Sequence, residues 1–123
     1  MEETGTKVLI VENEALIGWS IANALKKAGF IVSIVDSGEK AIEELNLTTF
    51  DLVITDLKLP RIDGFEVASN VKKISLQIPV LMMTATDKQT VNDASCKTNI
   101  DGIIEKPFDL NEITALAHKL TNH

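Results

Sequence analysis

The sequence predicts a doubly wound α/β fold, in which helices cover both sides of a five-stranded parallel sheet. Short apolar runs rich in Val, Ile and Leu alternate with longer segments that have helical spacing, five of each. No internal repeat, low-complexity tract or linker interrupts this alternation. Because connections between parallel strands are short and right-handed, consecutive βα units favour one such sheet. We expect a single domain over residues 1–123.

The strands are predicted from apolar runs that are too short for a typical helix. These runs lie at 7–11, 31–35, 51–55, 79–83 and 102–105. Continuous apolar runs are typical of parallel strands that are covered on both sides. We therefore expect each of the five strands to be buried on both faces.

The first two helices are predicted from apolar residues three or four positions apart. The first stripe consists of Ile17, Ile21, Ala24, Leu25 and Ala28. Gly29 follows it directly, and glycine is typical of a helix C-terminus. Ser37 can cap the start of a second helix, whose apolar residues are Ala41, Ile42 and Leu45.

Three further helices are predicted in the second half of the chain. Residues 64–74 carry Val67 and Val71 four positions apart. Residues 87–98 contain few apolar side chains, so we expect this fourth helix to pack weakly and to be the most mobile. Asp109 and Glu112 have the spacing of a capping box before the last helix, whose apolar face consists of Ile113, Leu116, Ala117 and Leu120.

Composition and charge exclude several classes of function. The net charge is −6 and the isoelectric point is about 4.8, which argues against direct binding to nucleic acid or an anionic membrane. No apolar run approaches the ~20 residues that span a bilayer, and the first residues do not resemble a signal peptide. The single cysteine, Cys96, cannot form an internal disulfide. We expect a cytoplasmic location.

Chemically distinctive residues lie at the ends of four predicted strands. Glu12 and Asn13 follow the first strand, Asp56 the third, Thr84 the fourth and Lys106 the fifth. Carboxylate and amide oxygens suit Mg²⁺, and an aspartate can accept a phosphoryl group. A hydroxyl and an ammonium can hold phosphate oxygens. Because ligands of such sheets bind at the carboxyl ends of the strands, the pattern predicts a phosphoryl-transfer site there.

In order and spacing, the motifs around these residues resemble the receiver domains of response regulators over essentially the whole chain. The matching segments are VENE (11–14), DLVITD (51–56), LP (59–60) with DG (63–64), MTA (83–85) and KPF (106–108). Each motif is weak alone, but the ordered set is specific. The resemblance implies a flavodoxin-like fold with strand order 2-1-3-4-5.

The resemblance also implies a role for each strand-end residue. Asp56 matches the acceptor of a phosphoryl group from a histidine kinase or a histidine phosphotransfer protein. Thr84 and Lys106 match the residues that hold that group. Such a domain is not an enzyme for an external substrate, since it catalyses only its own phosphorylation and dephosphorylation. The implied Mg²⁺ ligands are Glu12, Asn13, Asp56 and the backbone carbonyl of Lys58.

Partners follow from the same resemblance. Receivers meet the helices of their phosphodonor with the first helix, where Trp19 is expected to be exposed and is a candidate contact. A downstream protein would bind the fourth helix, the fifth strand and the last helix. A weak homodimer is also compatible with the family. The peptide bond before Pro107 is commonly cis in receivers.

The chain departs from the family pattern at two positions. Receivers usually carry a carboxylate where this chain has Asn13, so Glu12 and Asp56 would be the only acids at the metal, and we expect weaker Mg²⁺ binding. Many receivers carry an aromatic residue where this chain has Ile103. A switch that couples Thr84 to an aromatic ring therefore cannot operate here in its usual form.

Other functions remain as alternatives. The two departures are compatible with a pseudo-receiver, a protein-binding module that is never phosphorylated. A phosphatase of the haloacid dehalogenase class would carry a second aspartate where Lys58 stands, and an FMN-binding loop would not contain Glu12 and Glu14, which repel phosphate. The sequence does not identify the kinase or the output. It also leaves open whether this is a complete single-domain regulator or part of a longer protein.

Overall fold

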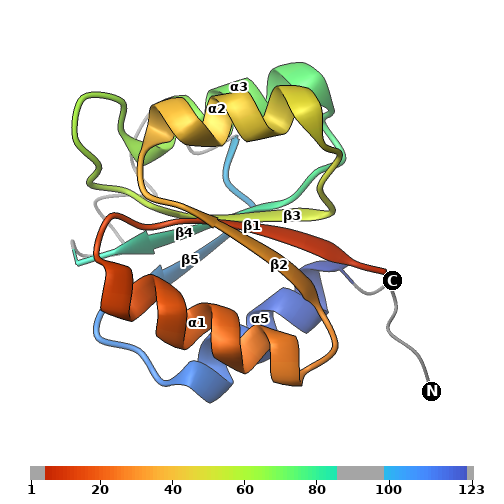
Figure 1. The fold of residues 1–123 in the computed structure, drawn as a ribbon, viewed down its shortest axis with the longest axis vertical. Coiled ribbons are helices and arrows are strands. Elements are labelled where there is room, and N and C mark those ends of the chain that lie inside the picture. The colour runs from red at the N-terminus through yellow and green to blue at the C-terminus, as the bar shows by residue number, and fades with distance from the viewer. Residues whose placement is uncertain (1–4, 86–98, 122–123) are drawn as a thin grey trace.

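The computed structural model describes residues 5–85 and 99–121 and shows the predicted doubly wound fold (Figure 1). A parallel sheet has the strand order β2-β1-β3-β4-β5, as expected. The elements are β1 (Lys7–Val11), α1 (Ala15–Lys27), β2 (Ile31–Val35), α2 (Gly38–Leu47), β3 (Leu52–Asp56), α3 (Gly64–Ile74), β4 (Val80–Thr84), β5 (Gly102–Glu105) and α5 (Leu110–Thr121). The helix predicted over 87–98 lies outside the described residues.

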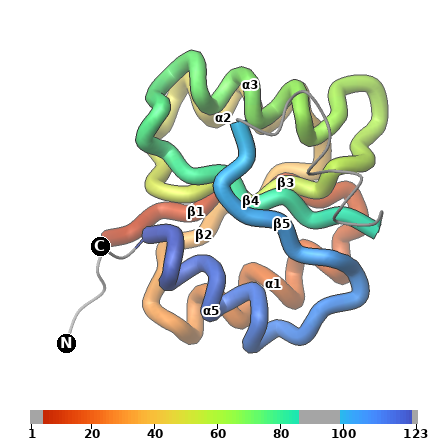
Figure 2. Tube along the Cα trace, turned by 180° about the vertical axis from the view of Figure 1, so that it is seen from behind, coloured from red at the N-terminus to blue at the C-terminus, as the bar shows by residue number. Residues whose placement is uncertain are grey.

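Helices cover the sheet from both sides, with α1 and α5 on one face and α2 and α3 on the other (Figures 1 and 2). The central strands send alternate side chains to the two layers: Leu52 and Ile54 pack in the first, and Val53 packs in the second. Both layers are almost wholly aliphatic, as the 4% aromatic content requires. In the part of the chain that the structure describes, no helix is long and apolar enough to cross a membrane.

The end of α1 confirms the role predicted for Gly29. This residue has a φ of +100°, in the region that glycine tolerates best. The N–H of Phe30 donates to the carbonyl of Leu25 at 3.1 Å, and the N–H of Gly29 donates to that of Lys26 at 3.0 Å. This pair of hydrogen bonds is a Schellman motif, which satisfies carbonyls that the helix leaves unpaired.

Side-chain caps predicted from the sequence are present at two other helices. The hydroxyl of Ser37 accepts a hydrogen bond from the N–H of Lys40 at 3.2 Å at the start of α2. At the start of α5 the carboxylate of Asp109 accepts one from the N–H of Asn111 at 3.0 Å. The partner differs from the predicted capping box, since the N–H of Glu112 donates to the backbone carbonyl of Asp109 at 3.0 Å. Both caps satisfy N–H groups that have no partner within the helix.

Two strands begin and end one residue later than predicted. In the parallel ladder, Asp56 lies opposite Met83 and Thr84 lies opposite Glu105, so β3 covers 52–56 rather than 51–55 and β4 covers 80–84 rather than 79–83. Pairing with the neighbouring strands sets these ends, and the apolar runs alone do not show it. Asp56 and Thr84 are therefore the last residues of their strands, held by the sheet.

The prediction that every strand is buried on both faces is wrong for β2 and β5. Ile31 and Ile34 of β2 are 38% and 43% exposed, and Glu105 of β5 is exposed. These strands form the two edges of the sheet, where the covering helices leave part of each face open. In contrast, β3 and β4 are buried along their whole length. Trp19 on α1 is 60% exposed, as expected.

Gly64 allows α3 to approach the end of β3. A Cβ atom at this position would lie 2.5 Å from the backbone oxygen of Asp56 and 2.8 Å from the Sδ of Met82. The N–H of Gly64 also donates to the carbonyl of Leu57 at 2.8 Å. Because the nearest of these atoms belongs to the backbone, a larger residue could be accommodated only if α3 moved away from Asp56.

We predict that Gly64→Ala lowers the free energy of unfolding by about 1–3 kcal/mol, the usual cost of overpacking. Gly18→Ala is the matched control, because a Cβ there would meet Ile34 at 3.5 Å, an ordinary contact. That change should stabilise the protein by up to about 1 kcal/mol through helix propensity. Urea denaturation measures both, and equal stability of the two variants would contradict the steric argument.

Candidate functional site

The carboxyl edge of the sheet brings three charged side chains together. The Nζ of Lys106 lies 3.1 Å from Glu12 Oε1 and 3.1 Å from Asp56 Oδ2. The side chain of Glu12 is completely buried, and that of Asp56 is 11% exposed. Charge-assisted hydrogen bonds of this kind are strong, and the burial of both acids makes their shared cation important.

Main-chain hydrogen bonds hold these residues in place. Lys106, just beyond β5, donates its backbone N–H to the carbonyl of Thr84 at 2.7 Å. Glu12, just beyond β1, donates its N–H to the carbonyl of Val35 at 3.0 Å. The second oxygen of Glu12, Oε2, accepts from the N–H of Glu14 at 3.1 Å, directly before α1. The site is therefore built on backbone that the sheet fixes.

The surroundings of Lys106 favour its charged form. Burial, the largest single influence, lowers the pKa of the Lys106 ammonium. Its hydrogen bonds to Glu12 and Asp56, together with their charges, outweigh burial and hold that pKa above its ordinary value of 10.5. At neutral pH, Lys106 is thus a fixed positive charge between two carboxylates.

The remaining predicted site residues also follow or end strands at this edge of the sheet. Thr84 ends β4, the strand between β3 and β5, and is 1% exposed. Asn13 directly follows Glu12, and Lys58 follows β3; both have exposed side chains. The peptide bond between Lys106 and Pro107 is cis, as the resemblance implied.

The side chains at the carboxyl edge of the sheet offer oxygen ligands of the type that Mg²⁺ prefers. Glu12 and Asp56 supply carboxylate oxygens, the ligand type that hard cations prefer. Within residues 5–85 and 99–121, no three His, Cys, Asp or Glu side chains gather closely enough to hold a metal ion. The neighbouring Asn13 can offer an amide oxygen without a charge. Lys106 already neutralises part of the acidic pair, and it would compete with a metal for both carboxylates.

Sequence analysis did not predict an apolar cleft of about 630 Å³ beside Lys106. It lies between the start of α1 and the segment after β5, and its apolar lining includes Leu16, Ile17, Ile21, Pro107, Phe108 and Leu110. Leu16 is 77% exposed. Leu16 lies outside the apolar stripe of α1. An apolar residue outside such a stripe is the sequence feature that could have predicted an apolar surface here.

Comparison with protein families gives a match to the response regulator receiver domain over residues 8–118. The transcriptional regulatory protein TcrA of Mycobacterium tuberculosis is 34% identical over 118 residues, which cover 96% of this chain and 47% of TcrA. The response regulator PmrA of Pseudomonas aeruginosa is 35% identical over 115 residues, which cover 94% and 52%. The chain therefore spans about half the length of these curated relatives.

Solved structures agree with this match. The response regulator TrrA of Thermotoga maritima, in complex with Mg²⁺ and BeF, is 26% identical with a TM-score of 0.85 and covers 94% of this chain and 98% of its own. The chemotaxis protein CheY4 of Vibrio cholerae, 24% identical with a TM-score of 0.88 over 95% and 99%, supports the flavodoxin-like fold alone. Since the family match spans almost all of the described sheet and helices, this chain belongs to the response regulator receiver domains of two-component signalling.

Proposed function

We propose that Asp56 accepts a phosphoryl group from a phosphohistidine of a kinase or phosphotransfer protein, with Mg²⁺, and that this changes binding to a downstream protein. The observation that carries the proposal is the carboxylate of Asp56 at the carboxyl edge, 3.1 Å from the ammonium of Lys106. In this proposal the output surface comprises β5, α5 and the predicted helix at 87–98, which lies outside the described residues.

The chemistry requires little beyond position and charge. A carboxylate oxygen of Asp56 attacks phosphorus, so that a P–O bond forms while the P–N bond breaks and imidazole leaves with the electron pair. The ammonium of Lys106 neutralises charge on the phosphoryl oxygens, and the hydroxyl of Thr84 donates to one of them. When bound, Mg²⁺ supplies further neutralisation. Its proposed ligands are Glu12, Asn13, Asp56 and the carbonyl of Lys58.

Lys106 would have an anionic partner both before and after phosphorylation of Asp56. A buried ammonium needs an anionic partner to offset its desolvation. Before phosphorylation the partners are Glu12 and Asp56. After phosphorylation the negative charge of Asp56 is replaced by that of the phosphoryl oxygens attached to it, so Lys106 keeps an anion on each side.

The direct test is intact mass after incubation with acetyl phosphate and Mg²⁺. We expect the wild type to gain one phosphoryl group that hydroxylamine removes, as it does an acyl phosphate, and Asp56→Asn to gain none. Asp63→Asn is the control, because Asp63 caps α3 through the N–H of Glu66 and asparagine caps equally well. This control should be phosphorylated like the wild type.

Two results would contradict the proposal. Equal phosphorylation of Asp56→Asn would remove Asp56 as the acceptor. A wild type that stays unmodified, with the protein folded and Mg²⁺ present, would favour a pseudo-receiver.

We further predict that Asn13→Asp tightens Mg²⁺ binding. A unit charge about 4 Å from another is worth about 4 kcal/mol at an effective dielectric of about 20, but repulsion from Glu12 and Asp56 and desolvation cancel most of it. A net gain of about 1–2 kcal/mol corresponds to about 5- to 30-fold in affinity. Calorimetric titration measures it, because the fluorescence of Trp19 on the exposed side of α1 can miss the event.

Asn13→Ser is the control for this titration, since a short hydroxyl adds no charge. If Asn13→Asp binds Mg²⁺ no more tightly than the wild type while Asp56→Asn loses binding, Asn13 lies outside the reach of the metal. The assignment of Glu12 and Asn13 as a metal-binding pair would then be wrong.

We also propose that the phosphodonor protein docks on the apolar cleft beside Lys106. Lys106 itself contributes to the cleft lining, so the cleft lies next to the ion pair between Lys106 and Asp56. Leu16 and Trp19 on α1 are 77% and 60% exposed, and a second hollow between α1 and α5 continues past Trp19. Exposed apolar side chains around a cleft suit the apolar face of a helix that presents phosphohistidine.

Leu16→Asp should therefore slow transfer from a phosphorylated histidine phosphotransfer domain by about 5- to 30-fold, the effect of losing a moderate interface contact. Phosphorylation by acetyl phosphate should be unchanged, because that small donor needs no docking surface. Leu47→Asp is the control, since Leu47 is 79% exposed at the far end of α2. Any phosphotransfer domain that phosphorylates the wild type serves as donor. Equal slowing with both donors, or an unchanged rate with both, would exclude the cleft as the docking surface.

A further inference from the structure

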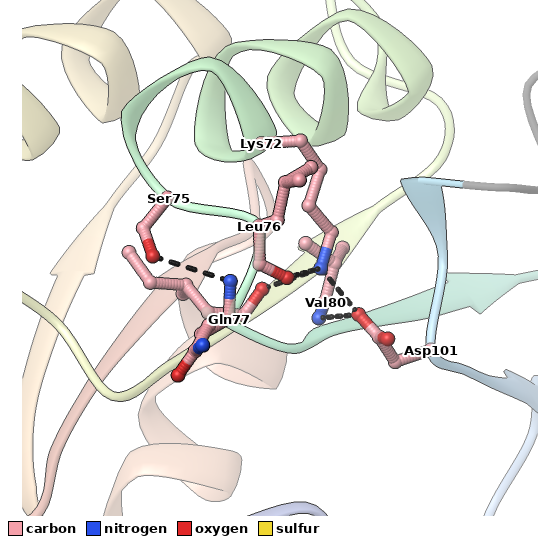
Figure 3. A network of polar contacts seen from close by, with 7 residues as sticks. Lys72, Ser75, Leu76, Gln77, Val80 and Asp101 are labelled. Atoms are coloured by element: carbon pink, nitrogen blue, oxygen red, sulfur yellow. Dashed lines mark hydrogen bonds and ion pairs between the residues drawn. The ribbon is translucent and has the colours of Figure 1, made fainter.

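Lys72 of α3 has a buried ammonium with a complete set of partners (Figure 3). Its side chain is 8% exposed. The Nζ donates to the carbonyl of Ile78 at 2.7 Å, to that of Leu76 at 3.3 Å and to the Oδ2 of Asp101 at 2.8 Å. An ammonium has three N–H donors, so all of them are used. The carboxylate of Asp101 is 40% exposed, so the buried partner of this ion pair is the ammonium, which would lose its only charged contact among the described residues if Asp101 were removed.

The partner carboxylate joins this ammonium to the sheet. Asp101 Oδ2 also accepts a hydrogen bond from the N–H of Val80 at 2.8 Å, and the N–H of Asp101 donates to the carbonyl of Val80 at 2.9 Å. Asp101 directly precedes β5 (Gly102–Glu105), so it fixes the point at which this strand joins β4. Lys72 in turn fixes the orientation of that carboxylate.

The position of Lys106 depends on the register of β5. This strand has four residues, and among the described strands it pairs with β4 alone. In the observed register Thr84 lies opposite Glu105, and the next residue, Lys106, reaches Glu12 and Asp56 at 3.1 Å each. A shift of one residue would turn every side chain to the other face, and a shift of two would move Lys106 by about 6.6 Å. Either shift would break both ion pairs.

We propose that Asp101, held by Lys72, is a positioning residue for Lys106: it fixes the register of β5 and so places the ammonium at Asp56. The inference rests on the proposed function for its effect on phosphorylation. Its effect on structure is independent of that function. The network lies at the opposite end of β5 from the site, so it acts through the strand and touches no reacting group.

A second carboxylate provides a matched control. Asp51 Oδ2 accepts a hydrogen bond from the N–H of Lys7 at 2.8 Å, the same kind of bond that Asp101 makes with Val80. However, the bond from Asp51 joins β1 and β3, and each of these strands has a neighbour on both sides. Loss of the Asp51 carboxylate should therefore reduce stability without changing register.

The first measurement is the rate of phosphorylation by acetyl phosphate with Mg²⁺. Asp101→Ala should slow it by about 10- to 100-fold, as misplacement of a catalytic group by about 1 Å or more does. Asp101→Asn should stay within about threefold, because its amide oxygen can still accept from both the N–H of Val80 and the ammonium of Lys72, as Oδ2 of Asp101 does. Asp51→Ala should also keep the wild-type rate. Unfolding in urea gives the stability of each variant.

The second measurement is hydrogen exchange at single backbone amides, which does not require phosphorylation. The N–H of Lys106, bonded to the carbonyl of Thr84 at 2.7 Å, should lose protection in Asp101→Ala and keep it in Asp101→Asn. The N–H of Leu57, bonded to the carbonyl of Met83 at 2.8 Å, should stay protected in both. If Asp101→Ala does not fold, Asp101→Ser takes its place, because its short side chain cannot make both bonds.

Three results separate the possibilities. If Asp101→Ala keeps the wild-type rate and the protection of Lys106, the proposal is overturned. It is also overturned if the rates of all three variants fall in proportion to their stability, since the role is then only structural. If the wild type is not phosphorylated at all, the proposed function fails, and the exchange of Lys106 alone decides whether Asp101 positions it.

Discussion

The structure of this receiver domain depends on one ammonium, that of Lys106, which binds two buried carboxylates. Glu12 follows β1 and Asp56 ends the neighbouring strand β3, and the two residues are only 1% and 8% exposed to solvent. Like charges in such a place repel strongly, and removal of the cation from a buried ion pair typically costs about 3–5 kcal/mol. Lys106, which follows the edge strand β5, places its ammonium between the two acids at 3.1 Å from each. Backbone hydrogen bonds at the ends of β1 and β5 hold Glu12 and Lys106 in this arrangement.

The sheet keeps them together through its parallel topology and its register. Parallel strands bring their carboxyl ends to one edge, and the reversal of strand order beside β1 leaves room there for a ligand. The sheet has the fewest strand-pairing contacts at β5, which is short and has only β4 as a neighbour among the described strands. Ion pairs lie at both ends of this strand: Lys72 pairs with Asp101 before it, and Lys106 pairs with Glu12 and Asp56 after it. The strand acts as a rigid link between them.

Asn13 changes the charge balance of this arrangement. An acid at that position would add a third negative charge at the carboxyl edge, next to Glu12 in the chain. With Asn13, one ammonium compensates one of two acids, so the uncompensated charge is smaller and the electrostatic attraction for Mg²⁺ is weaker. An asparagine at position 13 does not alter the contacts of Lys106 with Glu12 and Asp56, which form without it.

The sequence by itself determined the alternation of strands and helices, the strand order by family resemblance, and the residues at the strand ends, because periodicity, caps and motifs are local. Gly29 and Ser37 needed no tertiary information to be assigned as helix ends. Only the tertiary structure decided that Asp56 is the last residue of β3 rather than the first after it, that β2 is partly exposed, and that Lys106 binds Glu12 as well as Asp56. It alone joined Lys72 to Asp101, 29 residues apart. Such contacts depend on register and layer packing, which arise between segments that no local pattern connects.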